Sequence, residues 1–138
     1  MKNKLVDFGL LWLRVALGLG AMYHGWMKVT GEGGLASFAE HAVVGMGFPL
    51  PIVFAILAAG GELIGGFFVV LGLWTRYAAV GGAIVWLTAF FVYHQLDPFQ
   101  VKELAAAYSV MAVAIIITGP GRFSVDGGGK GGGRSSAN

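Results

Sequence analysis

Ionisable side chains gather at one end of several apolar segments, in a combination suited to proton exchange. They are histidine, lysine, tyrosine and glutamate residues at the ends of three segments: His24, Lys28, Tyr93, His94, Glu103 and Tyr108. Histidine exchanges a proton near neutral pH, and a carboxylate or tyrosine can orient it or relay the proton. We therefore predict proton exchange at this end, with His24 and Glu103 among the exchanging groups. The alternative is that the histidines are ordinary solvated groups at an interface.

Two further ionisable residues, Arg14 and Glu62, lie deep within apolar segments. Charges in hydrocarbon are costly, so such residues pair with one another or mark a functional site. Arg14 is the basic residue at a comparable depth, and we predict that it pairs with Glu62. Such a pair either fixes the register of two helices or forms the charged wall of a ligand pocket. In the second case Glu62 joins the proton-exchanging groups.

The predicted ligand-binding residues combine polar groups with part of a glycine-rich stretch. They are Arg14, Lys28, Gly65, Gly66 and Tyr108. Gly61 and Gly65 also form a small-xxx-small pair, which lets helix backbones approach closely. Helix packing is the simpler explanation of these glycines, and a glycine-lined slot for a flat ligand is the alternative.

The composition identifies the elements that hold these residues. Of the 138 residues, 57% are hydrophobic and 12% are charged, whereas an ordinary soluble domain carries about 25% charge. Four apolar segments, at about 8–27, 52–73, 78–95 and 102–119, are predicted to be transmembrane helices, because lipid tolerates only helices or closed barrels and strand-type alternation is absent. The last two have shorter apolar cores, which leaves a buried-core alternative for them. The predicted fold is an all-α integral membrane bundle of four transmembrane helices.

Lysine and arginine are shared unevenly between the two ends of this bundle. Short cytoplasmic connections are enriched in these residues, and here most of them lie near the termini or in the turn at Arg76. We therefore predict that both termini are cytoplasmic. In the first external loop, residues 35–43 carry apolar residues at helical spacing, which predicts a short amphipathic helix. Residues 1–126 form the membrane domain, and residues 127–138 form a flexible glycine-rich tail.

Several chemistries are excluded by what the sequence lacks. It contains no cysteine, which removes disulfides, thiol chemistry and iron–sulfur ligation. No paired ligand spacing supports a metal site, no phosphate-binding or hydrolase motif is present, and scattered basic residues give no nucleic-acid footprint. Any redox role therefore needs a non-covalently bound organic cofactor or a partner protein.

The sequence resembles the DoxX family of small four-span bacterial membrane proteins. Three stretches carry the likeness: LRVALGLGAMYHGWMK in the first span, GGELIGGFFVVLGLWTR in the second span and its turn, and ITGPGRFSVD after the fourth. The resemblance covers nearly the whole chain except the tail. It makes Arg14, His24, Lys28, Glu62 and Arg76 candidates for site residues, and it implies a multi-pass protein of the bacterial inner membrane.

The resemblance also implies a connection with redox chemistry. Relatives in the family include the membrane subunit of an archaeal thiosulfate:quinone oxidoreductase and membrane partners in oxidant-defence complexes. We therefore expect an accessory subunit that binds quinone or a similar small apolar ligand and works with a redox partner protein, if it is an enzyme component at all. One alternative is a non-catalytic scaffold, docking through residues 35–43 and the turn at Arg76. Another, less favoured, is a small transporter, for which four spans would require a homo-oligomer.

Overall fold

The structure, a computed structural model, describes residues 4–128 and is built from helices in that range. Four segments are long and apolar enough to cross a membrane. They are α1 (Lys4–Thr30), α3 (Pro51–Leu71), α4 (Thr75–Thr88) with its π-helical continuation η3 (Ala89–Tyr93), and α5 (Phe99–Thr118). The shorter elements are α2 (Gly34–Phe38), the π-helical η1 (Ala39–Val43), the 3-10 helix η2 (Val44–Met46) and α6 (Val125–Gly128). The predicted all-α bundle is confirmed, with no strand among the described residues.

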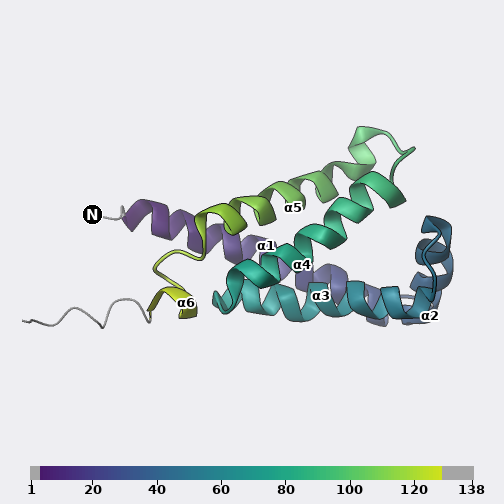
Figure 1. The fold of residues 1–138 in the computed structure, drawn as a ribbon, viewed down its shortest axis with the longest axis horizontal. Helices are drawn as coiled ribbons and strands as arrows, with labels where there is room; N and C mark the ends of the chain where they lie inside the picture. Colours follow the sequence, from purple (N-terminus) through teal and green to yellow (C-terminus); the bar gives the residue numbers. More distant parts are fainter. Residues whose placement is uncertain (1–3, 129–138) are drawn as a thin grey trace, which may run out of the picture.

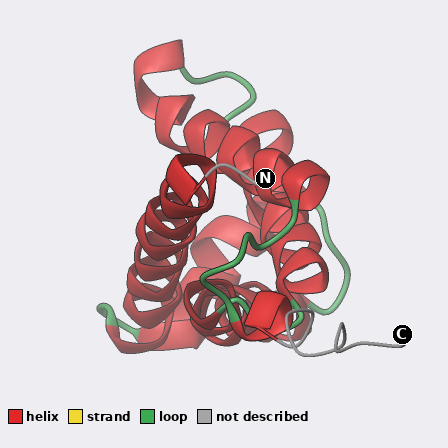
Figure 2. Cartoon of the chain, turned by 90° about the vertical axis from the view of Figure 1, so that its left-hand side faces the viewer, coloured by secondary structure: helices red, strands yellow, loops and turns green. Residues whose placement is uncertain are grey.

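The long helices run back and forth, so the bundle has two ends (Figure 1). The terminal end carries the start of α1, the turn between α3 and α4, and α6. The loop end carries α2, η1, η2 and η3. Seen from the terminal end, helices and connecting loops account for all of the described chain (Figure 2). The loop end corresponds to the predicted external side, an orientation that stays a prediction from the charge distribution.

Helix α1 packs along α3 through glycines, and these contacts set the register of the two helices. A Cβ atom on Gly66 would lie 2.6 Å from the carbonyl oxygen of Gly18, and one on Gly25 would lie 2.8 Å from the carbonyl oxygen of Ala59. Only glycine fits at such backbone-to-backbone contacts, as in other membrane helix pairs. Close packing therefore explains Gly66, whereas the predicted pair Gly61 and Gly65 makes no tight contact: a Cβ atom there would lie 4.0 Å from Val85 and 3.7 Å from the carbonyl oxygen of Ala78.

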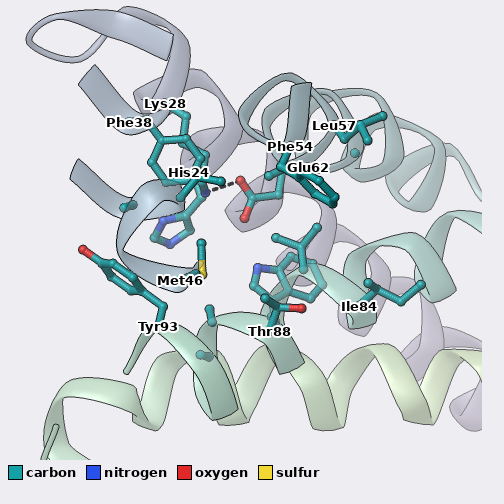
Figure 3. Close-up of a pocket in the computed structure, with 18 of the residues that line it drawn as sticks. His24, Lys28, Phe38, Met46, Phe54, Leu57, Glu62, Ile84, Thr88 and Tyr93 are labelled. Carbon is teal, nitrogen blue, oxygen red and sulfur yellow. Dashed lines mark hydrogen bonds and ion pairs between the residues drawn. The ribbon is translucent and has the colours of Figure 1, made fainter. Parts of the chain in front are cut away.

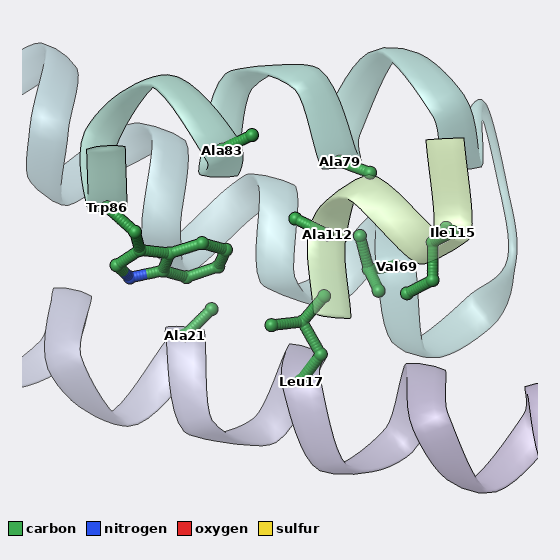
Figure 4. Packing of buried hydrophobic residues seen from close by; sticks show 8 residues of the cluster. All are labelled: Leu17, Ala21, Val69, Ala79, Ala83, Trp86, Ala112 and Ile115. Carbon is green, nitrogen blue, oxygen red and sulfur yellow. The ribbon is translucent and has the colours of Figure 1, made fainter. Parts of the chain in front are cut away.

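Helix α4 lies between α3 and α5, and the hydrophobic core forms where these helices meet α1 (Figure 4). The core side chains are mostly small, with one tryptophan: Leu17, Ala21, Val69, Ala79, Ala83, Trp86, Ala112 and Ile115. Small residues bring the helices close near the middle of the bundle. Toward the loop end, α4 and α5 diverge from α3 (Figure 1), and side chains there do not fill the space between them.

The segment after α5 folds back across the terminal end, and we call residues 119–128 the C-terminal clip. Asp7 on α1 accepts a hydrogen bond of 2.9 Å from the backbone N–H of Arg122. Arg14, which is fully buried, donates through Nη2 to the carbonyl oxygen of Phe123. The clip therefore ties the start of α1 to the end of the described chain.

Asp126 of the C-terminal clip also caps the first turn of α4. Its carboxylate accepts hydrogen bonds from the backbone N–H groups of Trp74 and Thr75, at 3.0 and 2.9 Å, and from the Thr75 hydroxyl at 2.8 Å. Its own N–H donates to the carbonyl oxygen of Gly72 at 2.8 Å. The first N–H groups of a helix have no partner within the helix, and here a residue some fifty positions away supplies one.

We expect Asp126→Asn to destabilise the fold by about 1 kcal/mol, the usual cost of losing a good helix cap. Burial by itself raises the pKa of the Asp126 carboxyl. The donors on Thr75 and Trp74 and a nearby guanidinium outweigh that effect, so the pKa lies below its usual range. A depressed pKa means that the stabilisation is present above the pKa of an unfolded aspartate and is lost as the pH falls through the folded value.

Thermal unfolding in detergent at pH 7 and at decreasing pH tests this expectation. The wild type should lose more stability on acidification than Asp126→Asn does, and the exposed Glu32→Gln should behave as the wild type. Equal melting temperatures of wild type and Asp126→Asn at pH 7 would show that the cap contributes nothing.

Candidate ligand cavity at the loop end

A cavity of about 620 Å³ opens at the loop end, between the four long helices and beneath the α2–η2 segment. This volume lies within the range of about 300–1,000 Å³ that is usual for small-molecule sites. Most of its lining is apolar, including Phe38, Met46, Phe54, Leu57 and Ile84 (Figure 3). Both π-helical segments, η1 and η3, contribute lining residues, and such segments recur at functional sites.

A buried ion pair forms the polar part of the cavity wall. Glu62 on α3 is only 2% exposed and pairs with the Nζ atom of Lys28 on α1 (Figure 3). The indole of Trp86 on α4 lies on the same part of the cavity lining as the carboxylate. Lys28 also lies 5.3 Å above the ring of Phe38, a distance at which a cation and an aromatic face attract. Lys28 thus compensates one buried carboxylate at the edge of an apolar space.

The predicted pairing of Arg14 with Glu62 is wrong, because the two residues lie at different levels of the bundle. The α1–α3 contacts place Gly25 against Leu63, so Glu62 is level with the loop-end part of α1. Arg14 lies about 15 Å nearer the terminal end, at 1.5 Å of rise per residue. Lys28 is one turn beyond Gly25, and its long side chain reaches back to the carboxylate.

Aromatic rings continue the polar wall from the ion pair toward α5. The ring centroids of His24 and Tyr108 are 5.7 Å apart, and those of Tyr108 and Trp86 are 5.2 Å apart. All three side chains line the cavity. Within residues 4–128 the imidazole of His24 makes ring contacts but no hydrogen bond. Its nitrogens are therefore available to a ligand.

A second polar group lies on the far rim of the cavity. His94 and Tyr93 both line it, and their rings are in contact at 4.6 Å between centroids. The Nδ1 atom of His94 donates a hydrogen bond of 2.6 Å to the carboxylate of Asp97. The predicted convergence of histidine, tyrosine and carboxylate groups at this end is thus present, although its members form two groups.

Glu103, Gly65 and Gly66 are predicted site residues that do not line the cavity. Glu103 is exposed and is not among the lining residues, because Leu104 and Tyr108, one turn apart, define the inward face of α5. Gly65 and Gly66 adjoin a void of only about 10 Å³, barely the space of one water molecule. A slot for a flat ligand is therefore not present at these glycines.

Arg14 also lies away from the cavity, and the structure gives it a structural role at the terminal end. Its side chain is fully buried, beside the carbonyl of Phe123 and the carboxylate of Asp126. Its Nε and Nη1 atoms have no hydrogen-bond partner in the part of the chain that the structure describes. Arg14 does not line the loop-end cavity, and its hydrogen bond to Phe123 ties α1 to the C-terminal clip.

Sequence reasoning missed Trp86 and the cover of the cavity. A tryptophan in mid-span buries an N–H that needs an acceptor, and this signal could have pointed to Glu62. The predicted amphipathic segment 35–43 is helical, but its apolar side faces inward, where Ala39 and Val43 pack against Ala55 of α3. These residues cover the cavity and leave no free apolar face for the docking role considered above.

The predicted tail, 127–138, lies outside the described residues from position 129 onward.

Comparison with known proteins agrees with this architecture. The family model for DoxX matches residues 9–95. Among curated proteins, the inner membrane protein YqjF of Escherichia coli (strain K12) is 31% identical over 128 residues, which is 90% of this chain and 94% of that protein. No solved structure shows a significant match.

Proposed function

The chain belongs to the DoxX family and is a multi-pass inner membrane protein, and from this premise we propose that it binds quinone, or a similar small apolar ring, in the loop-end cavity. The observation that carries the proposal is a buried, compensated ion pair on the wall of an apolar cavity within the membrane-spanning helices. Ionisable groups in such places are usually functional.

The cavity lining can contact both the apolar ring and a carbonyl oxygen of such a ligand. The aromatic and aliphatic side chains accept the ring, and Lys28 and the imidazole of His24 offer donors to a carbonyl oxygen. A quinone takes up protons when it is reduced. The carboxylate of Glu62 and the imidazole of His24 are groups that exchange protons, and both lie on the cavity wall.

We further propose that the protein acts as an accessory subunit of a membrane redox system. A chain without cysteine has no thiol to pass electrons from a sulfur compound or a disulfide. Electrons for a bound quinone would then come from a partner protein. Purification of this protein from native membranes under mild conditions would identify that partner.

Binding of decylubiquinone to the purified protein in lipid nanodiscs tests the ligand. Quinones quench indole fluorescence, and Trp86 lines the cavity, so saturable quenching is expected. His24→Phe keeps the aromatic contacts but removes both ring nitrogens, and we expect it to weaken binding about fivefold to tenfold, the worth of one good hydrogen bond. The measurement is a fluorescence titration at constant lipid content.

The matched control is His41→Phe, at an exposed position of the same end that does not line the cavity. It should bind as the wild type does. Quenching without saturation in the wild type, or equal affinities of His24→Phe and His41→Phe, would contradict the proposed site.

A further inference from the structure

The loop-end cavity has an opening between α3 and α4. The two helices lie side by side nearer the terminal end, where a Cβ atom on Gly65 would lie 3.7 Å from the carbonyl oxygen of Ala78. Toward the loop end they diverge (Figure 1). Leu57 on α3 and Ile84 on α4 both line the cavity, and each is 62% exposed. Exposed lining side chains on two diverging helices mark an opening between them.

Two glycines keep this opening clear. Gly61 and Gly81 line the cavity on its two sides. A Cβ atom on Gly81 would meet nothing within 4 Å, and one on Gly61 would meet only Val85, at 4.0 Å. We call the opening bounded by Leu57, Gly61, Gly81 and Ile84 the α3–α4 gap. Its position within two spanning helices means that it faces the acyl chains of the bilayer and not water.

The cavity is polar at one side and apolar at the other. Figure 3 shows His24 and Lys28 on one side of Glu62, and Leu57 and Ile84 on the other. The charged groups Lys28 and Glu62 thus lie away from the outer edge of the α3–α4 gap, and the gap itself is bounded by aliphatic side chains and glycine. A ligand with its polar group at the ion pair would extend an apolar part toward lipid.

We propose that the ligand is a membrane-borne amphiphile that enters sideways from the bilayer, with a polar ring at Lys28 and Glu62 and a hydrocarbon tail lying in the α3–α4 gap. This inference rests on the proposed function and adds the class of ligand, its orientation and its route. Gly81 and Leu57 become determinants of specificity for the tail, and the polar wall determines recognition of the ring.

Substitutions that fill the α3–α4 gap test the inference through equilibrium binding, because the equilibrium affinity depends on how the ligand sits in the bound state. Gly81→Leu places a side chain in the gap without an overlap with the backbone, and leucine favours the helix over glycine. We expect it to weaken binding of decylubiquinone at least fivefold in nanodiscs. Binding of 2,3-dimethoxy-5-methyl-1,4-benzoquinone, which has the same ring and no tail, should change less than twofold.

Two controls separate the gap from a general effect on the fold. Gly60→Leu is matched to Gly81→Leu, because a Cβ atom there also meets nothing within 4 Å and Gly60 does not line the cavity. Leu57→Phe provides a second test of the gap, with Ile64→Phe as its control: the two residues are 62% and 61% exposed on the same helix, and only Leu57 lines the cavity.

The outcomes distinguish this inference from the proposed function. Selective loss of the tailed quinone in Gly81→Leu and Leu57→Phe, with both controls unchanged, supports sideways entry. If both gap variants bind the tailed quinone as the wild type does, or lose both quinones equally, the inference is overturned and the ring site stands. A wild-type protein that binds neither quinone contradicts the proposed function itself.

Discussion

Replacing Gly66 with leucine is expected to prevent α1 from packing on α3 and so to destabilise the fold by about 3 kcal/mol or more. A Cβ atom at this position would lie 2.6 Å from the carbonyl oxygen of Gly18 and 3.0 Å from the backbone nitrogen of Met22. Both are backbone atoms, so the helices themselves would have to separate. Thermal unfolding in detergent, followed by circular dichroism, measures the loss.

Gly60→Leu is the control for this experiment as well, since it makes the same change on the same helix where nothing lies within 4 Å. We expect it to be as stable as the wild type or slightly more so, because leucine is the better helix former. A Gly66→Leu protein with a wild-type melting temperature would mean that the close α1–α3 contact does not exist.

The second large effect is expected from Lys28→Met, which leaves the carboxylate of Glu62 buried without its cation. Removing one partner of a buried pair costs about 3–5 kcal/mol, whereas replacing both by apolar residues is often neutral or stabilising. The double variant Lys28→Met with Glu62→Met should therefore recover most of the stability lost in the single variant.

Equilibrium unfolding of the wild type, both single variants and the double variant forms a complete cycle. A strong positive coupling supports the pair, and additive losses would contradict it. Arg14 offers an independent comparison: because it lies at the terminal end, Arg14→Met combined with Glu62→Met should be additive. Coupling between these two substitutions would instead support the Arg14–Glu62 pair that the sequence alone predicts.

The number and class of the elements could be predicted from the sequence because these depend on local properties. The hydropathy of about twenty consecutive residues decides whether a helix can cross the hydrocarbon core, so the four spanning helices required no knowledge of their neighbours. The same holds for the helix at 35–43, whose apolar spacing lies within the segment itself. The gathering of His24, Lys28 and Tyr108 at one end followed from counting along these helices.

The partner of Glu62 depended on the tertiary structure, since depth along a helix must be compared between helices whose register is not known in advance. Glycine contacts between residues some forty positions apart set that register, and they bring Lys28, not Arg14, to the carboxylate. Glu103 fell outside the site for a related reason, because one position along a helix turns a side chain by about 100°.

The cavity could be recognised only in the folded chain, since it is the space left where α4 diverges from α3. The sequence determined that this protein has four spanning helices with ionisable residues inside them, because polarity and apolar length are properties of each segment. The tertiary structure decided that His24, Lys28 and Glu62 line an apolar cavity and that Arg14 does not, because crossing angles and register arise only when helices pack.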